Sequence, residues 1–318
     1  MENILSQQLS HHKNETVASI GEENIISIAN NFFSETIKNM PNVIKGIGDD
    51  AAVLTPPSNE FYQLVTIDTV VEGTHFTPDT SPEKIGWKAM AVNISDIAAM
   101  GGIPDYAVIS AALPKELPII FLEKLLSGIK SAAEKFNVAV VGGDTVGSDI
   151  LSITITLFGK VEKQYLCSRD GAKPGDIIAA TGSLGGSFKT DKHLDFTPRV
   201  EEARWLVKNA KPSAMMDLSD GLAMDSSRIA KASNVSIKLF SDMIPVTDGF
   251  SIENALNDGE DFELLCLFPE NNITDEIIKE FEDKFDLKLT VIGKTEHPPA
   301  EIYLDRSELK TKSFNHFV

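Results

Sequence analysis

Acidic side chains recur in this sequence wherever an apolar run meets glycine. Six segments share the pattern: GIGDDAAV (46–53), LVTIDTVVEGTHF (64–76), NISDIAAMGG (93–102), VVGGDTVG (140–147), MMDLSDGL (215–222) and NDGEDFELL (257–265). An apolar run that ends at Gly and Asp is typical of a buried element that surfaces into a turn, so we expect these carboxylates at loop mouths above a core. Converging carboxylates repel each other unless cations neutralise them, and aspartate oxygens without Cys or His partners suit Mg²⁺. The pattern predicts a Mg²⁺-dependent enzyme that acts on phosphates.

One of these aspartates, Asp96, is predicted to lie on the buried face of a helix. A helical stripe within residues 82–100 consists of Ile85, Ala89, Val92 and Asp96. A charge on this face needs a cation or hydrogen-bond donors, because an unpaired buried carboxylate is costly. The alternative is that Ser95 or Asp96 caps the turn that follows.

Two further acidic pairs have both a structural and a functional interpretation. Asp49 and Asp50 follow Gly-Ile-Gly, and Asp217 and Asp220 bracket Ser219 before a predicted helix. The second pair could supply an N-cap, since Asp and Ser favour that position. In the functional interpretation both aspartates hold metal and Ser219 contacts a phosphate oxygen.

Glycines and isolated cations complete the candidate set. Residues 142–144 (Gly-Gly-Asp) follow the apolar run 138–141, which predicts a buried strand with backbone N–H groups facing a ligand at its end. Arg169 is the best-placed lone cation for phosphate, or it forms an ion pair with Asp170. His75 could act as a general acid, as a general base or as a hydrogen-bond donor to phosphate. Alternatively, it is a histidine packed against a strand. Since the sequence has no Gly-x4-Gly-Lys-[Ser/Thr] loop, ATP would have to bind through metal.

Composition limits the class of protein. The chain has 318 residues, which fits two domains, and its 29 basic and 47 acidic residues give a net charge of −18. This charge argues against nucleic acid or an anionic membrane as partner. Cys167 and Cys266 occur in no Cys-x-x-Cys spacing, which predicts a reducing cytoplasm without disulfides or a zinc site. No leader and no apolar run of about 20 residues is seen, so we expect a protein that does not enter the membrane.

The elements that must position these residues alternate between strands and helices. Residues 1–20 predict a loose tail, and a helix is expected over 21–33. Strands are predicted at 61–71, 138–141, 151–158, 176–181, 235–240, 262–268 and 289–293, with one more running into Asp217. Helices are predicted at 82–100, 117–136, 201–209 and 220–232. The turn-rich segment 160–176 predicts the boundary between two α/β domains with mixed (α+β) sheets, 21–160 and 161–318.

Several segments, taken together and in order, resemble the thiamine-monophosphate kinase family. They are GIGDDAA, TIDTVVEGTHF, IGWKAMAVNISDIAAMGGIP, GGDT, RDGAKPGD, MMDLSDGL, GEDFELL and the terminal NHF. This family is related to aminoimidazole ribonucleotide synthetase, selenophosphate synthetase and a hydrogenase maturation factor. The resemblance implies ATP-dependent phosphorylation of thiamine monophosphate to thiamine diphosphate. It also implies a homodimer whose N-terminal domains share a β-barrel, with the site in the cleft between the two domains.

The resemblance also implies a role for each matching residue. The metal positions are Asp50, Thr66, Asp68, Asp96, Asp144, Asp217 and Asp220. Among them, Asp96, Asp144 and Asp220 act in phosphoryl transfer together with Arg169. The nucleotide-phosphate contacts are Gly142, Gly143, Arg169 and Ser219. The thiamine-phosphate contacts are His75, Glu260 and Phe314, and the resemblance implies that the Phe314 ring stacks on the vitamin. The sequence pattern alone leaves open whether this ring stacks or serves as a packing anchor.

The sequence departs from the family pattern at Ile67, Asp170, Asn257-Asp258 and Ser313. Two other functions are weighed against this one. The first is a synthetase of the same superfamily that phosphorylates an amide or a selenide. The second is a non-catalytic protein that binds nucleotide or divalent cations.

Overall fold

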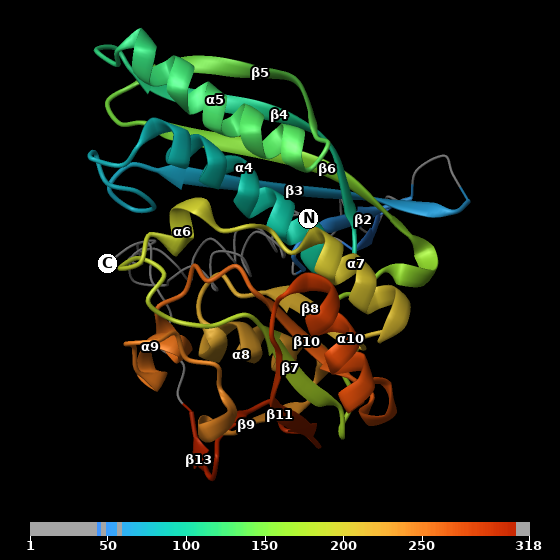
Figure 1. Cartoon of the computed structure of the whole chain (residues 1–318). Coiled ribbons are helices and arrows are strands. Elements are labelled where there is room, and N and C mark those ends of the chain that lie inside the picture. The colour runs from blue at the N-terminus through green and yellow to red at the C-terminus, as the bar shows by residue number, and fades with distance from the viewer. Residues whose placement is uncertain (1–42, 46–48, 56–58, 310–318) are drawn as a thin grey trace, which may run out of the picture.

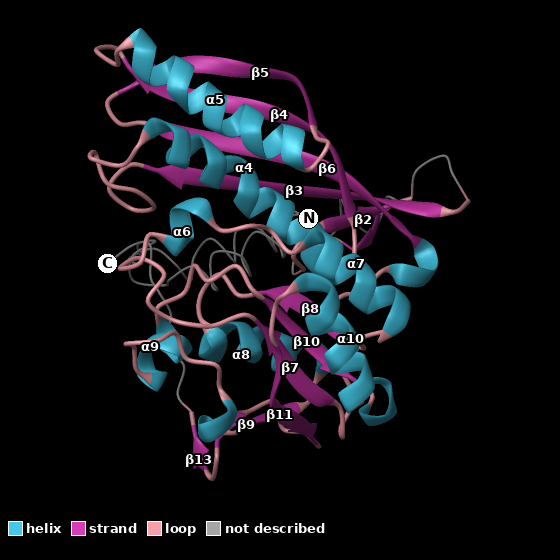
Figure 2. Ribbon diagram, in the orientation of Figure 1, coloured by secondary structure: helices cyan, strands magenta, loops and turns pink. Residues whose placement is uncertain are grey.

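The structure is a computed structural model that describes residues 43–45, 49–55 and 59–309. Within these ranges the chain forms two separate β-sheets with helices packed against them, a mixed α/β architecture (Figure 1; Figure 2). The mixed α/β class predicted from the sequence is therefore confirmed. The predicted tail 1–20, the predicted helix 21–33 and Phe314 lie outside the described residues.

The first sheet has six strands in the order β1-β2-β3-β6-β4-β5. Its strands are β1 (Val43–Lys45), β2 (Ala52–Leu54), β3 (Phe61–Val71), β4 (Ile103–Pro114), β5 (Ala139–Ser148) and β6 (Ser152–Glu162). Strand β6 pairs antiparallel with both β3 and β4, whereas β4 and β5 are parallel and are joined by a helical crossover. Asp68 pairs with Ile155 and Thr69 with Thr154, so the two residues face opposite sides of the sheet.

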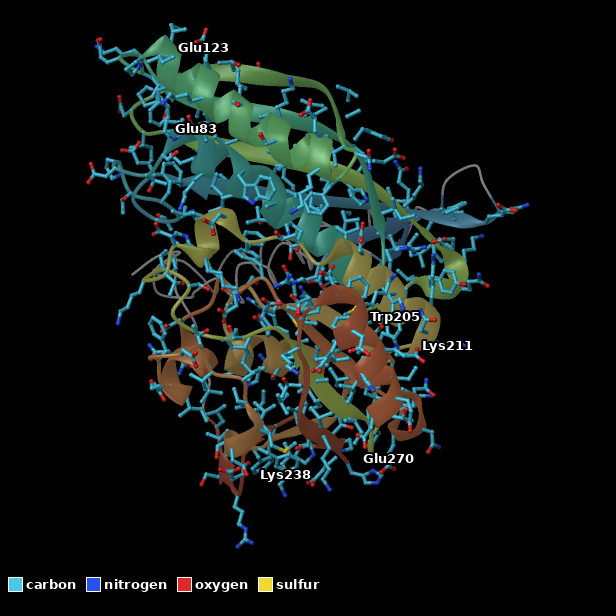
Figure 3. All side chains as sticks on the ribbon, in the orientation of Figure 1. Glu83, Glu123, Trp205, Lys211, Lys238 and Glu270 are labelled. Atoms are coloured by element: carbon cyan, nitrogen blue, oxygen red, sulfur yellow. The ribbon has the colours of Figure 1, made fainter. Side chains whose placement is uncertain are left out.

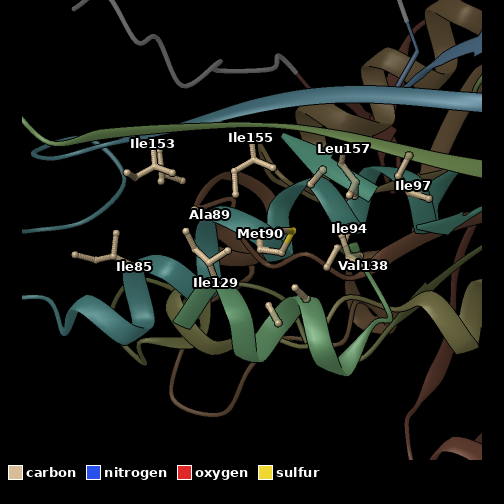
Figure 4. Packing of buried hydrophobic residues seen from close by; sticks show 14 of the residues in the cluster. Ile85, Ala89, Met90, Ile94, Ile97, Ile129, Val138, Ile153, Ile155 and Leu157 are labelled. Atoms are coloured by element: carbon tan, nitrogen blue, oxygen red, sulfur yellow. The ribbon is translucent and has the colours of Figure 1, made fainter. Parts of the chain in front are cut away.

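Two helices cover one face of this sheet. They are α4 (Pro82–Ala99) and α5 (Ile119–Lys135). The alternate residues of β6 that face them, such as Ile153 and Ile155, are buried against Ile85, Met90 and Ile129 (Figure 4). This apolar layer fixes the rotation of α4, and thereby the direction of the polar side chains on the same helical stripe.

No helix of the described residues covers the other face of the first sheet, which we call the open face, and β5 lies at the edge of this sheet. Strand β5 is exposed from Ala139 to Gly147, and Val141 is 63% exposed and Ile67 of β3 62%. The expectation of a buried strand at 138–141 is therefore wrong for most of its length. Apolar side chains on an edge strand need a cover from outside the described residues, and an apolar pattern alone does not distinguish such a strand from a core strand.

The second sheet has seven strands in the order β13-β12-β9-β11-β7-β10-β8. Its strands are β7 (Ile177–Thr181), β8 (Ala214–Asp217), β9 (Ser236–Leu239), β10 (Leu264–Phe268), β11 (Leu289–Glu296), β12 (Ile302–Leu304) and β13 (Ser307–Glu308). Buried residues of β10 alternate between two apolar layers: Leu265 and Leu267 face one, and Leu264 and Cys266 face the other. Both faces of this sheet are therefore covered.

The helices of this half are α6 (Lys192–Asp195), α7 (Val200–Asn209), α8 (Leu222–Ser233), α9 (Ile252–Asn257) and α10 (Asp275–Phe285). Helices α8 and α9 supply one apolar layer, and α7 and α10 supply the other. Trp205 of α7, labelled in Figure 3, meets Phe281 and Phe285 of α10 edge-on. No helix in the described ranges is both long and apolar enough to span a lipid bilayer.

Helix α4 joins the two halves. Its N-terminal part packs in the first core, whereas Ala98 near its C-terminus is buried with Leu206 and Met215 of the second half. The carboxyl end of α4 therefore lies beside strand β8. The helix predicted at 82–100 and the strand predicted to run into Asp217 are confirmed, and they meet here.

Candidate functional site

A cavity of about 380 Å³ lies where α4, β3, β8 and the loops beside them meet. The predicted metal ligands that line it are Asp50, Thr66, Asp68, Asp96, Asp217 and Asp220. The predicted phosphate and acceptor contacts that line it are Arg169, Ser219, His75 and Glu260. The structure thus brings together residues that are up to 210 positions apart in the sequence (Asp50 to Glu260).

Three carboxylates form the acidic cluster of this cavity: Asp50, Asp96 and Asp217. One oxygen from each lies within 4.8 Å of the others. Asp50 precedes β2, Asp96 lies on α4 and Asp217 ends β8. Three hard oxygen ligands at this separation suit a divalent cation such as Mg²⁺, so the residues present fit the metal that the sequence implies.

Hydrogen bonds fix two of these carboxylates. Thr66 of β3 donates its hydroxyl to Asp96 (2.5 Å), and Ser95 donates its hydroxyl to Asp217 (2.6 Å). The C-cap of α4 is Met100. The alternative that Ser95 or Asp96 serves as a turn cap is therefore wrong, because Ser95 donates to Asp217 and Asp96 lines the cavity.

Four carboxylates of this cavity are hard to ionise, chiefly because they are buried. Burial, followed by the neighbouring carboxylates, raises the pKa of Asp96 and of Asp217 well above the usual range. Burial raises the pKa of Asp68 to about 7, and burial with repulsion from Asp50 raises the pKa of Asp49 to about 6. A pocket that holds several carboxylates in this state favours a cation.

Arg169 provides the protein's own positive charge at the cluster. Its guanidinium makes a bidentate ion pair with Asp50, at 2.7 Å through Nε and 2.6 Å through Nη2. Asp170 instead pairs with Lys45. The alternative that Arg169 is neutralised by Asp170 is therefore wrong, and the cation lies in the cavity.

Asp220 belongs to a second ion-pair network at the cavity wall. Arg228 of α8 pairs with Asp220 and with Asp225, the latter at 2.8 Å. The N-cap of α8 is Gly221, which has a φ of 98°. The N-cap interpretation of Asp217 and Asp220 is thus wrong. Sequence reasoning missed Arg228, although its spacing of three residues from Asp225 on a helix is a usable signal.

A buried lysine connects the acceptor residues. Lys88 of α4 is 1% exposed; its ammonium pairs with Glu260, donates to the carbonyl of His75 (2.9 Å) and lies 3.0 Å from Nδ1 of His193. Glu260 has a φ of 53°, a strained conformation of the kind found at functional sites. Lys88 lies three residues after Ile85, so the helical stripe already placed it inward, and the sequence reasoning did not use it.

The structure does not bring Gly142, Gly143 and Asp144 into this cavity. They lie on exposed β5, and Asp144 shares a cross-strand row with Ser110 of β4 on the open face. Asp68 faces the opposite, helix-covered side. Because β3 and β5 are separated by β6 and β4, the expectation that Asp144 joins the cluster within one chain is corrected.

The stability of the metal-free protein is expected to fall as the pH rises from 5 to 8. The pKa values of Asp49 (about 6), Asp68 (about 7) and Asp225 (about 7) are raised by burial, whereas an unfolded aspartate titrates near 3.9, so the folded state binds more protons in this window. Thermal unfolding in EDTA measures this, and we expect the Tm to drop by about 5 °C or more. Mg²⁺ should raise the Tm more at pH 8 than at pH 5, and a Tm in EDTA that stays level or rises would contradict the assignment.

Comparison with known proteins finds matches to one family over most of the chain. The family model for the AIR synthase related protein, N-terminal domain, matches residues 48–161, and that for the C-terminal domain matches residues 173–304. The chain is 36% identical to the thiamine-monophosphate kinase of Buchnera aphidicola over 91% of this chain and 98% of that protein. For the enzyme of the same name from Bacillus subtilis the values are 37%, 86% and 93%. The solved structure of AaThiL complexed with AMPPCP and TMP is 29% identical, with a TM-score of 0.83 over 96% of this chain and 99% of that one.

Proposed function

The chain belongs to the thiamine-monophosphate kinase family, and from this premise we propose that it transfers a phosphoryl group from ATP to thiamine monophosphate, giving thiamine diphosphate, in a Mg²⁺-assisted in-line reaction. The acceptor oxygen belongs to a phosphate monoester whose second pKa is about 6, so it is already mostly ionised near neutral pH. No general base is needed. The difficulty is to bring two anions together in the correct geometry.

The observation that carries this proposal is the acidic cluster of Asp50, Asp96 and Asp217, with oxygens within 4.8 Å of one another. Bound Mg²⁺ would neutralise charge on the phosphate groups of both substrates. Asp68 and Asp220 extend this ligand set along the cavity wall. The hydroxyls of Thr66 and Ser95 hold their carboxylates in place, which keeps the ligands preorganised.

Two groups of side chains divide the substrates between them in this proposal. Arg169 and Ser219 line the cavity beside the acidic cluster and would contact phosphate oxygens of the nucleotide. His75 and Glu260, connected through Lys88, would contact the thiamine phosphate. Phe314, outside the described residues, keeps its predicted stacking role as a proposal.

An assay with radiolabelled ATP tests this function. We expect label from the γ-phosphate in thiamine diphosphate, and ADP release that depends on thiamine monophosphate. A non-catalytic binder would release no ADP in response to the acceptor. A synthetase of the same superfamily would release ADP with an amide or a selenide and leave thiamine monophosphate unchanged. Either result would reject the proposed function.

We further propose a homodimer in which the first sheets of two copies meet through their open faces. Val141 and Ile67 expose large apolar surface on β5 and β3, and β5 has an unpaired edge in the described part of the chain. Strand β2 pairs with β3 only up to Val65. Residues 66–71 of β3 therefore form a second unpaired strand edge in the described part of the chain. Joining the edge of β5 to this one would close a barrel and remove both edges.

This dimer would bring Asp144 of one copy toward the metal site of the other. If the edge of β5 joins residues 66–71 of β3 in the second copy, Gly142, Gly143 and Asp144 would lie beside the strand that carries Thr66 and Asp68 of that copy's cavity. Gly142 and Gly143 would then present backbone N–H groups to the nucleotide of that copy. The assignment of Asp144 to the metal site is thereby kept, but across the interface.

Mixing two inactive variants tests the interface. Asp96→Asn and Asp144→Asn should each be nearly inactive, whereas refolding them together gives dimers in which one of the two sites has both aspartates. At equal mixing, half of the dimers are mixed, so activity should recover to about a quarter of the wild-type value. If Asp144 acts within its own chain, every mixed dimer retains two defective sites and the mixture stays inactive.

Two other assignments remain proposals. The domain bounds 21–160 and 161–318 are supported by the gap between β6 and β7, which belong to different sheets. A cytoplasmic location is supported by Cys167 and Cys266, both buried as free thiols.

A further inference from the structure

An exposed aromatic ring lies at the cavity wall. Phe188 lines the cavity and is 46% exposed. The other phenylalanine in the described part of the lining, Phe262, is 6% exposed and stacks on Phe196 with ring centroids 4.0 Å apart. Phe262 is thus a core residue, whereas Phe188 exposes apolar surface beside a largely acidic cavity.

The loop that carries Phe188 is fixed by hydrogen bonds. The backbone N–H of Gly185 donates to both carboxylate oxygens of Asp261 at 3.0 Å, and the hydroxyl of Ser187 donates to the same carboxylate at 2.8 Å. The N–H of Gly186 donates to Asp258 at 3.0 Å. Because Ser187 is fully buried directly before Phe188, the backbone position of Phe188 is set before any ligand arrives.

The ring is also supported from behind. The imidazole of His193 lies with its centroid 4.3 Å from that of Phe188, at an interplanar angle of 30°. Nδ1 of His193 in turn lies 3.0 Å from the ammonium of buried Lys88. This chain of contacts from Lys88 through His193 holds the Phe188 ring at the same end of the cavity as Glu260.

We propose that Phe188 is a specificity-determining residue, whose ring stacks against the heteroaromatic cation of the acceptor. This inference rests on the proposed function and adds a second aromatic contact for the same substrate. The thiazolium ring of thiamine carries a positive charge, which favours an aromatic face. The ammonium of Lys88 lies 5.6 Å from the centroid of the Phe188 ring and is paired with Glu260, and Asp258 adds negative charge to the cavity wall. Adenine is neutral and would interact less strongly with these charges. We therefore expect the ring of the acceptor, and not the adenine of ATP, to stack on Phe188.

Steady-state kinetics of Phe188→Ala and Phe188→Trp test this. With Phe188→Ala we expect the KM for thiamine monophosphate to rise about 10-fold, while the KM for ATP and kcat change less than about 3-fold. Phe188→Trp restores a stacking face, so its KM for thiamine monophosphate should lie within about 3-fold of wild type. Met243, 40% exposed and outside the cavity lining, provides the matched control, and Met243→Ala should change none of these constants.

An unchanged KM for thiamine monophosphate in Phe188→Ala would overturn the inference and leave the proposed function intact. A rise in the KM for ATP alone would assign the ring to adenine and overturn it as well. If Phe188→Ala lowered both kcat and Tm, and Phe188→Trp lowered them as well, the role of Phe188 would be structural. Wild-type protein without acceptor-dependent ADP release would instead remove the proposed function, and this inference with it.

Discussion

Replacing Asp96 by Asn is expected to abolish most phosphoryl transfer while raising the thermal stability of the metal-free protein. The asparagine side chain keeps the shape of aspartate and can still accept the hydrogen bond from Thr66. It removes one charge from the acidic cluster with Asp50 and Asp217. We expect kcat to fall by about 10²- to 10³-fold in saturating Mg²⁺, since a preorganised electrostatic contact is lost.

The gain in stability follows from the same charge. Because burial and neighbouring carboxylates raise the pKa of Asp96, its ionised form destabilises the folded protein at pH 8, and asparagine avoids that cost. Asp105, a surface aspartate paired with Lys160 at 3.1 Å, supplies the matched control. Asp105→Asn should leave kcat unchanged. The assignment of Asp96 to the metal site would be rejected if Asp96→Asn turned over at nearly the wild-type rate. A Tm in EDTA below that of the wild type would reject it as well.

Replacing Arg169 by Met is expected to cause a loss of stability that Mg²⁺ partly restores. The change leaves the Asp50 carboxylate, whose side chain is fully buried, without its bidentate partner. Removing one member of a buried ion pair costs about 3–5 kcal/mol, and a bound cation would neutralise the same carboxylate. Urea unfolding at pH 8 with EDTA or with Mg²⁺ measures both effects. Activity should also fall, because the nucleotide phosphates lose a cation.

Arg204, which is buried to a similar extent, offers a control outside the cavity. It donates to Glu162 and to the carbonyl of Gly101, both at 2.7 Å. Arg204→Met should also lose stability, but Mg²⁺ should restore none of it. If Mg²⁺ stabilised both variants to the same extent, its effect would be general and the pairing of Arg169 with a metal ligand would be wrong. Arg169→Lys should keep the positive charge but lose the bidentate contact with Asp50.

Much of the site could be predicted because side-chain direction on a regular helix follows from spacing. Asp96 occupies the fourth position of the Ile85 stripe, and the structure places it in the cavity as expected. Lys88 obeys the same rule, but spacing alone does not favour a buried lysine, because lysine is rarely buried in proteins. The partner of Arg169 could not be predicted, since Asp50 is distant in sequence whereas Asp170 is adjacent.

The errors arise where the environment of a segment depends on residues far along the chain. The run 138–141 is apolar enough for a core, but β5 is an exposed edge strand. The face on which Asp144 lies depends on its pairing with Ser110 of β4, and register of this kind is not visible in one strand's sequence. Strand β4 itself was missed, because its segment IPDYAVISAALP has no clear alternation of polar and apolar residues.

The most direct test of the central claim is ³¹P NMR of a reaction that contains the protein, ATP and thiamine monophosphate, with Mg²⁺ or with EDTA. If the acidic cluster works by holding Mg²⁺ between two anionic substrates, resonances of ADP and of the β-phosphorus of thiamine diphosphate grow together with Mg²⁺, and neither grows in EDTA. Equal rates of product formation in EDTA, or ADP without thiamine diphosphate in Mg²⁺, would contradict it.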